Sequence, residues 1–278
     1  MSQEFIDAHH HLWKYSKEQY PWMLAGMESI RRDFLIPELQ EVTREAAVTG
    51  TVAVQARQML EESRWLLGLA AQTDLIRGVV GWVPLVESGV AAHLEMLSAD
   101  SKFKGVRHVL HDEVDDFYML RDDFNRGIAL LKNFNLRYDI LIFERHLPQT
   151  IQFVDRHPNQ IFIVDHIAKP KIKDRILSPW DRNIAELAKR ENVYCKISGM
   201  VTEANWKNWG EEDLSPYFDK VLTAFGPQRL MIGSDWPVIL VASEYSHWIS
   251  ILRRWIDSLS SAEELYISSK TAVTAYRL

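Results

Sequence analysis

The sequence contains a single cysteine, Cys195, so no disulfide bond can form within the chain. It has no run of basic residues, and its formal net charge of −6 argues against a nucleic-acid-binding protein. No apolar stretch near the first residue reaches the length of a signal peptide or a membrane-spanning helix. We therefore expect a cytoplasmic protein that binds neither nucleic acid nor membrane, with Cys195 as a small buried residue.

Two further features are missing. No linker rich in glycine, proline or serine divides the 278 residues, and 47% of them are apolar, enough for one large core. The position after the first predicted strand holds histidines, whereas a doubly wound nucleotide-binding sheet usually carries a glycine-rich phosphate loop there. These absences favour one domain over residues 1–278 and disfavour a doubly wound fold.

Short apolar segments alternate with amphipathic segments along the whole chain, at intervals of roughly 30 residues, the spacing of βα units. Strands are predicted within residues 5–13 and over residues 51–55, 77–82, 103–108, 137–142, 160–166, 193–197 and 229–233. The predicted helices include one that starts at Ser215-Pro216 and a short C-terminal helix opened by Ser261 and Glu264. Eight such units predict a single (β/α)₈ TIM barrel in the α/β class.

The connection after the first strand is long and aromatic. Residues 13–32 hold Trp13, Tyr15, Tyr20 and Trp22, and they directly follow a histidine cluster. Connections of this length without regular structure are commonly binding loops or lids. We predict that this stretch covers the mouth of the barrel.

Three histidines, His9, His10 and His11, end the first predicted strand. Because alternate residues of a strand face the same side, His9 and His11 should project together, with Asp7 behind them and His10 pointing the other way. Two imidazoles offered side by side make half of a metal site. A tag remnant is the alternative, but no linker separates these histidines from the hydrophobic strand.

In a (β/α)₈ barrel the chemistry lies at the carboxyl ends of the strands. The predicted strand ends carry mostly polar or aromatic residues: His9, His11, Gln55, Trp82, Arg107, His108, Glu144, His166, Ser198 and Asp235. Three imidazoles and one carboxylate among them, from His9, His11, His166 and Asp235, suit zinc or another divalent first-row ion. Such a site with an open position activates water for hydrolysis.

These motifs together resemble those of the amidohydrolase superfamily, and within it the branch of sugar-lactone hydrolases. The resemblance rests on Asp7-Ala8-His9-His10-His11-Leu12-Trp13, Val54-Gln55-Ala56, Gly81-Trp82-Val83, Gly105-Val106-Arg107-His108, Asp165-His166-Ile167-Ala168-Lys169-Pro170, Lys196-Ile197-Ser198-Gly199-Met200 and Gly233-Ser234-Asp235-Trp236-Pro237. It implies a metal site at His9, His11, His166 and Asp235, with Asp235 and His166 as catalytic residues. Members with two ions carry a carboxylated lysine at the end of strand four or a histidine at the end of strand five, whereas here strand four ends in Arg107-His108 and strand five runs on into Ile142-Phe143-Glu144.

The resemblance therefore implies one divalent ion, expected to be zinc, although some relatives in this branch work without a metal. It implies a hydrolase of carbohydrate metabolism that opens a small sugar-acid lactone, such as a fucono-, rhamnono- or galactono-lactone. Gln55, Trp82, Arg107, His108 and Trp236 are the candidate substrate-binding residues.

The residues leave alternatives open. Arg107 could instead form a structural ion pair, the tryptophans could be core, and Lys169 could be a solvated charge. Related barrels also include metal-dependent decarboxylases of aromatic or unsaturated acids. A ligand-binding barrel without catalysis is disfavoured because no strand-end residue is missing. Barrels of this kind often pair, which makes a homodimer one candidate assembly.

Overall fold

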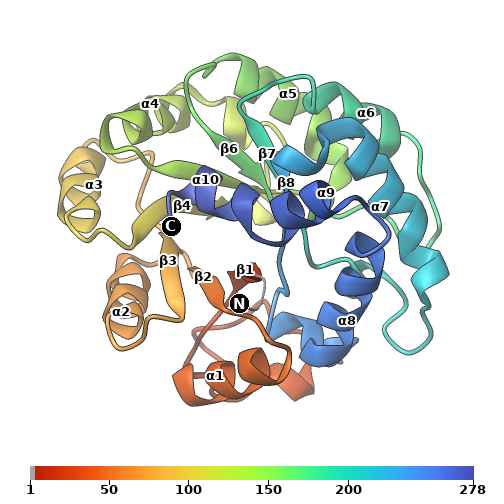
Figure 1. Ribbon diagram of the computed structural model, residues 1–278. Helices are drawn as coiled ribbons and strands as arrows, with labels where there is room; N and C mark the ends of the chain where they lie inside the picture. Colours follow the sequence, from red (N-terminus) through yellow and green to blue (C-terminus); the bar gives the residue numbers. More distant parts are fainter. Residues whose placement is uncertain (1–3) are drawn as a thin grey trace.

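The computed structural model describes residues 4–278 and contains one sheet of eight parallel strands, in the order β1 to β8 (Figure 1). The strands are β1 (Ile6–His10), β2 (Gly50–Val54), β3 (Ile76–Gly81), β4 (Phe103–Val109), β5 (Arg137–Leu141), β6 (Phe162–Val164), β7 (Val193–Ile197) and β8 (Leu230–Ile232). Helices follow them in turn: α1 (Ile36–Glu45), α2 (Leu60–Ala70), α3 (Val90–Ser98), α4 (Asp122–Leu131), α5 (Leu147–Asp155), α6 (Trp180–Leu187), α7 (Glu211–Phe225) and α8 (Tyr245–Ile256). The predicted (β/α)₈ barrel is confirmed.

The strands are covered on both faces. Every residue of β1, β2 and β5 is buried, as expected for parallel strands that pack on helices outside and on side chains inside. Cys195 in β7 is also fully buried. In the part of the chain that the structure describes, no helix combines the length and apolarity that crossing a membrane requires.

The barrel closes at a seam between β1 and β8. The Asp235 amide donates to the His9 carbonyl at 2.8 Å, and the His11 amide donates to the Trp236 carbonyl at 2.6 Å. Asp7, fully buried in this seam, accepts hydrogen bonds from the Ser234 amide at 2.8 Å and the Ser234 hydroxyl at 2.6 Å. The seam thus sets the first and last strand ends side by side.

The amino end of the barrel is plugged by the C-terminal helices α9 (Ser261–Leu265) and α10 (Thr271–Tyr276), which lie across the near face in Figure 1. Side chains from α10 pack on a cluster from five strands: Ile6, Ala8, Val52, Val54, Val80, Ile163 and Met231, with Ala272, Ala275 and Tyr276. Apolar burial of this kind contributes about 25 cal/mol per Å². The plug leaves the carboxyl ends of the strands as the open end of the barrel.

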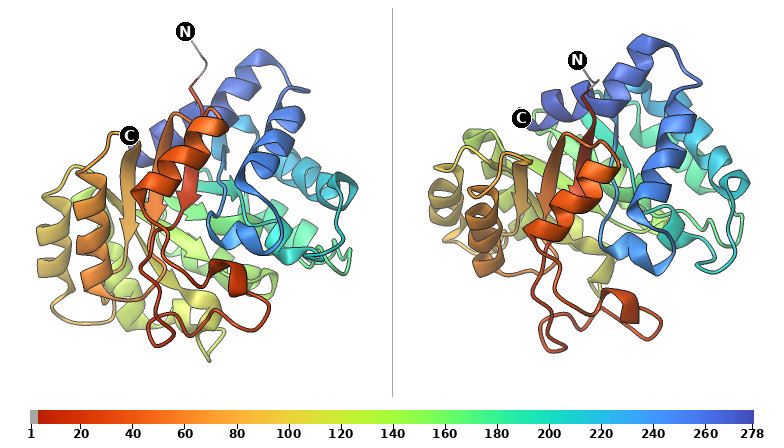
Figure 2. Two further views of the ribbon diagram at one scale, coloured as in Figure 1. Left: turned by 90° about the horizontal axis from the view of Figure 1, so that it is seen from below. Right: turned by 60° about the horizontal axis from the view of Figure 1, so that its bottom comes forward.

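The long connection after β1 lies at that open end, opposite the C-terminus (Figure 2). Trp13 is fully buried at its start, where its backbone pairs with Phe34 and its indole donates to the Arg32 carbonyl at 2.8 Å. The rings of Tyr20 and Trp22 pack on Trp13, at 5.7 and 5.9 Å between centroids. Aromatic packing therefore gives this irregular segment a fixed position.

Two helix starts differ from the sequence prediction. Helix α7 begins at Glu211, before the predicted Ser215-Pro216 start, because the Gly210 amide donates to the Asp213 carboxylate at 3.1 Å; Pro216 lies inside the helix. The capping box of α9 is Ser260 with Glu263, one residue earlier than the predicted pair. In both helices an acidic side chain, Asp213 or Glu263, accepts from the amide of the residue before the helix and so fixes an earlier start.

Helix α4 packs closely on the loop after β3, at Gly127. A Cβ added there would lie 2.1 Å from the Leu85 carbonyl oxygen, a backbone atom that cannot move aside, whereas at Gly68 on α2 it would meet nothing within 4 Å. Gly127→Ala should therefore lower the free energy of unfolding by about 1–3 kcal/mol. Gly68→Ala should raise it by about 0.5–1 kcal/mol, since alanine loses less entropy in a helix. Urea unfolding of both variants measures the two changes in the free energy of unfolding. Equal changes in the two variants would contradict the prediction.

Candidate active site

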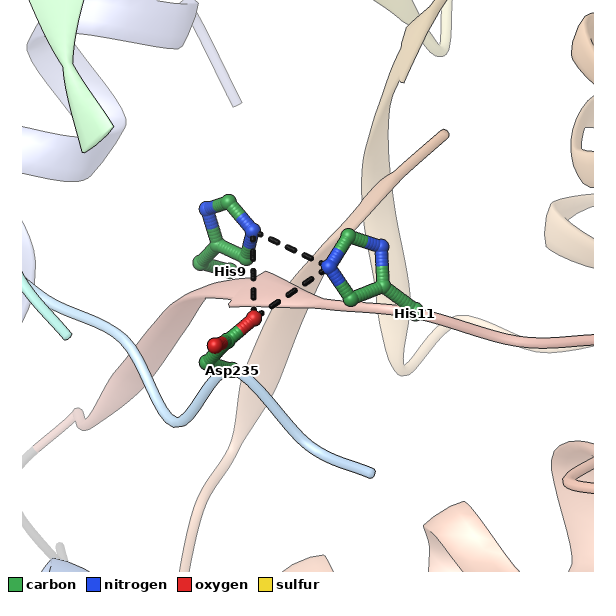
Figure 3. Close-up of side chains that lie close together, drawn as sticks. All are labelled: His9, His11 and Asp235. Atoms are coloured by element: carbon green, nitrogen blue, oxygen red, sulfur yellow. Dashed lines mark hydrogen bonds and ion pairs between the residues drawn. The ribbon is translucent and has the colours of Figure 1, made fainter. Parts of the chain in front are cut away.

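Three side chains converge at the open end of the barrel: His9 and His11 from the end of β1, and Asp235 from the segment after β8 (Figure 3). The two Nε2 atoms lie 3.2 Å apart, and Asp235 Oδ1 lies 3.7 Å from His9 Nε2 and 3.3 Å from His11 Nε2. Ligand atoms about 2.0–2.1 Å from a tetrahedral zinc ion stand roughly 3.3 Å from one another. The spacing of the three atoms thus suits a divalent metal ion.

Hydrogen bonds on the far side of each ring set its tautomer. His11 Nδ1–H donates to the Val54 carbonyl at 2.7 Å, which leaves a lone pair on Nε2. Arg107 can only donate and lies 3.3 Å from His9 Nε2, which favours a lone pair on that atom, while His9 Nδ1 lies 3.1 Å from Lys196 and 3.3 Å from Asp165. Two imidazole lone pairs and a carboxylate oxygen then face one another. This arrangement is repulsive unless a cation or a proton lies between them, so the residues fit a metal ion.

The prediction that Asp7 shares a face with His9 and His11 is wrong. The pairing of β1 with β2 shifts register between Asp7 and His10, which breaks the strict alternation of side chains. Asp7 therefore contacts the Tyr245 hydroxyl of α8, at 3.1 Å, while His9 lies among the charged residues inside the barrel. Burial raises the pKa of Asp7 to about 6 despite its hydrogen bonds.

The segment after β6 is a left-handed turn. Strand β6 ends at Val164, before the predicted His166, and residues 166–169 all have positive φ angles, between 47° and 62°. A β-branched residue such as Ile167 is rare in this region and strained there. The turn is held by a hydrogen bond from the Trp180 indole to the Ile167 carbonyl, at 2.7 Å. It directs His166 and Lys169 into the open end of the barrel.

His166 lies beside the three-residue cluster. Its Nε2 is 3.9 Å from Asp235 Oδ1, and its Nδ1 is 2.9 Å from the Ser198 hydroxyl. Burial lowers the pKa of His166 to about 4, so the ring is neutral at pH 7. Burial alone would raise the pKa of Asp235, but His166 and His11 hold it well below its usual value. At neutral pH a carboxylate and a neutral imidazole therefore face each other.

The predicted four-ligand set is divided by this geometry. His9, His11 and Asp235 form one group of candidate ligands, while His166 forms a second group with His9 and Asp165. The structure thus brings all four residues together but gives His166 a place next to the first group.

A network of buried charged side chains contacts His9 at its Nδ1 atom. Lys196, fully buried, lies 2.6 Å from Asp139, 3.0 Å from Asp165 and 3.1 Å from His9 Nδ1. Arg107 adds a second cation, 3.0 Å from Asp165. Burial would raise the pKa of Asp165, but Lys196 and His9 hold it well below its usual value. The two cations balance the two carboxylates, and sequence analysis missed this network because Lys196 and Asp139 lie inside apolar strands.

A cavity of about 330 Å³ opens above the cluster. Its polar residues include His11, Arg107, His111, His166, Lys169, Glu203 and Asp235, and its apolar ones include Trp22, Met27, Val109, Phe143, Trp206 and Val238. Ligand cavities in proteins measure roughly 300–1,000 Å³, so this cavity lies at the small end of that range and suits one sugar-sized ring. Trp22 and Met27 come from the connection after β1, which therefore covers the mouth as predicted.

Four of the predicted substrate-binding residues do not line this cavity: Gln55, Trp82, His108 and Trp236. Gln55 donates to the Arg107 carbonyl at 3.3 Å, and Trp236 is buried against Phe34. The Trp82 indole lies 3.3 Å from the His108 ring, which also contacts Glu113 at 2.6 Å. Each of these four side chains therefore contacts other protein groups and does not line the cavity.

Other residues that line the cavity were not predicted. His111 lines the cavity and stacks on Phe143 at 4.7 Å between ring centroids. Lys169 is mostly buried rather than solvated and pairs with Glu203 at 2.9 Å. Glu203 and Trp206 lie in the connection after β7, where the sequence carries no periodic pattern that would have indicated them.

Comparison with known proteins gives consistent results. The profile of the amidohydrolase family matches residues 6–278. The L-fucono-1,5-lactonase of Burkholderia multivorans is 39% identical over 98% of this chain and 96% of its own length, and that of Burkholderia ambifaria is 35% identical over 88% and 85%. The crystal structure of a Burkholderia multivorans amidohydrolase with bound zinc is 39% identical, covers 99% of both chains and superposes with a TM-score of 0.94.

The convergence of His9, His11 and Asp235 predicts binding of a divalent ion, with Zn²⁺ as the probe. His11→Ala should weaken Zn²⁺ binding at least about tenfold, since losing even an outer hydrogen-bond partner of a ligand costs 10–100-fold. The matched control is His247→Ala, because His247 is an exposed histidine on α8. This variant should bind Zn²⁺ as tightly as the unaltered protein does. Calorimetric titration measures both. Equal affinity in the two variants would mean that the ion binds elsewhere.

Proposed function

Since this chain belongs to the amidohydrolase family, we propose that it hydrolyses a small sugar-acid lactone, with L-fucono-1,5-lactone as the first candidate. Two relatives that cover most of the chain are L-fucono-1,5-lactonases. One observation carries the proposal: an ionised carboxylate, Asp235, faces three imidazoles at the base of a cavity of sugar size. This arrangement suits attack of water on a ring carbonyl.

Asp235 is the proposed general base. It contacts the histidines through Oδ1, so the other carboxylate oxygen can take a proton from water. The oxygen of that water attacks the lactone carbonyl, and the proton then passes from Asp235 to the ring oxygen as the carbon–oxygen bond breaks. The products are the open sugar acid and the regenerated carboxylate.

His166 and Arg107 stabilise the oxyanion that forms on the carbonyl oxygen. If the Ser198 hydroxyl donates to His166 Nδ1, at 2.9 Å, then Nε2–H points into the cavity as a donor. Arg107 lines the same cavity and brings a positive charge, while its ion pair with Asp165 fixes its position. The sequence left two roles open for Arg107, substrate binding and a structural ion pair, and in this proposal it has both.

A zinc ion is the proposed cofactor, and His9, His11 and Asp235 would hold it. When bound, it would polarise the carbonyl and lower the pKa of a water molecule. The zinc-bound form of the related Burkholderia multivorans amidohydrolase supports this identity of the ion.

The charges of the cavity favour a lactone over the acid substrate of a decarboxylase. Two cationic side chains line the cavity among the residues described, and each has a carboxylate partner: Arg107 with Asp165, and Lys169 with Glu203. Each positive charge is therefore balanced by a carboxylate, so neither side chain supplies a net attraction for a carboxylate on the substrate. Incubation with a panel of sugar lactones and a pH indicator tests the proposal, because ring opening releases acid. Carbon dioxide release from aromatic acids without lactone hydrolysis would overturn it.

Asp235→Asn should reduce kcat by at least about 10²-fold, since an amide of the same shape cannot accept the proton. The protein should remain folded and should still bind the product acid, because the substitution removes a negative charge. Stopped-flow or indicator kinetics and a calorimetric titration measure the two effects. Lactone hydrolysis at nearly the original rate would show that another group is the base.

Trp22→Ala should raise KM at least about fivefold and leave kcat nearly unchanged, since this ring forms the cavity wall away from the reacting atoms. Trp65→Ala is the matched control: Trp65 is also half-buried, but it lies on α2 and does not line the cavity. Its KM should be that of the original enzyme. A lower melting temperature for Trp22→Ala with normal KM would mean that this loop serves packing alone.

A further inference from the structure

A second polar pair lies in the cavity and takes no part in the proposed reaction. Lys169 is the last residue of the left-handed turn after β6, and Glu203 ends the 3₁₀ turn Val201–Glu203 after β7. Lys169 Nζ and Glu203 Oε1 are 2.9 Å apart, and the side chains are only 15% and 21% exposed. The connections that carry them are joined by a hydrogen bond from the Lys173 amide to the Glu203 carbonyl, at 2.9 Å. The pair is therefore built into the wall.

The pair has hydrogen-bonding capacity to spare. The ammonium of Lys169 has three donors, and its side-chain hydrogen bond among residues 4–278 is the one to Glu203. Glu203 uses Oε1 for this bond, which leaves Oε2 as an acceptor. Burial would lower the pKa of Lys169, but Glu203 and Asp235 raise it, so the lysine is charged. The cavity wall thus offers both a donor and an acceptor that carry charge.

We propose that the Lys169–Glu203 pair selects uncharged, hydroxylated lactones. Lys169 donates to one ring hydroxyl and Glu203 accepts from another, while the carboxylate of Glu203 cancels the positive charge that would attract a lactone bearing a carboxylate. This inference rests on the proposed lactone hydrolysis and adds to it the charge class of the substrate.

The physical basis is the strength of charge-assisted hydrogen bonds and the sign of the charges. A carboxylate accepts from a hydroxyl more strongly than a neutral oxygen does, so Glu203 favours a polyhydroxylated ring. A substrate carboxylate near Glu203 would instead face a like charge in a partly buried site, where screening by water is weak. The other cation of the cavity, Arg107, is paired with Asp165 and is assigned to the lactone carbonyl, so it is not available to a second carboxylate of the substrate.

Glu203→Gln tests the proposal, because glutamine keeps the size of the side chain and removes its charge. The readout is kcat/KM for L-fucono-1,5-lactone and for a sugar lactone that carries a free carboxylate, such as an aldaric acid lactone. For the neutral lactone, KM should rise at least about fivefold with kcat nearly unchanged. For the carboxylated lactone, kcat/KM should rise, so that the preference for the neutral substrate falls at least about tenfold.

A matched control lies close by. Glu144 pairs with Lys171 at 3.2 Å, and Lys171 lies two residues after Lys169 in the chain. Neither Glu144 nor Lys171 lines the cavity. Glu144→Gln should leave the substrate preference unchanged. Lys169→Gln removes the opposite charge and should increase the preference for the neutral lactone, which keeps the test informative if Glu203→Gln does not fold. Unchanged preference in both cavity variants, or an equal change in Glu144→Gln, would overturn the proposal.

Failure of this inference can be told apart from failure of the proposed function. If the unaltered protein opens no lactone, the proposed function fails, and affinities for a neutral and a carboxylated sugar lactam still report on charge selection. Calorimetric titration of these lactams should show the same tenfold change in preference for Glu203→Gln. If lactone hydrolysis is present but neither preference changes, only the role of the pair is wrong.

Discussion

The contact between the first and the last strand is the constraint on which the site depends. His9 and His11 follow β1, Asp235 follows β8, and more than two hundred residues separate them in the chain. Asp7 joins the two strands through both the amide and the hydroxyl of Ser234. Because its carboxylate is fully buried and multiply hydrogen-bonded, loss of this contact would leave an unsatisfied charge and would also separate the histidines from their carboxylate.

Beneath that contact, the barrel interior carries charge where most barrels carry apolar side chains. Lys196 and Arg107 lie against the carboxylates of Asp139 and Asp165. Lys196 and both carboxylates are fully buried. Burying charges is costly, and such networks are often no more stabilising than apolar packing. Here the network fixes the His9 ring, because Lys196 and Asp165 lie 3.1 and 3.3 Å from its Nδ1, while its Nε2 faces His11 and Asp235. Its arrangement thus relates to function rather than to stability alone.

Backbone strain links the reaction to substrate selection. The left-handed turn after β6 presents His166 at one end and Lys169 at the other, so one strained segment carries both the proposed oxyanion donor and half of the proposed specificity pair. Asp235 also has a positive φ, of 60°. Strained residues persist where surrounding contacts fix them, and at this site they aim side chains that an extended strand would direct elsewhere.

The sequence by itself determined the barrel, because eight apolar segments at regular spacing are a local pattern. It also indicated His9, His11, His166 and Asp235, because polar residues at strand ends stand out from the apolar runs before them. Tertiary structure alone decided which residues line the cavity. The bulge in β1 turns Asp7 outward, and packing places Trp236 behind the wall. The partners of Lys169 and Lys196 come from distant strands and loops, and a single chain read in order carries no signal of those distances.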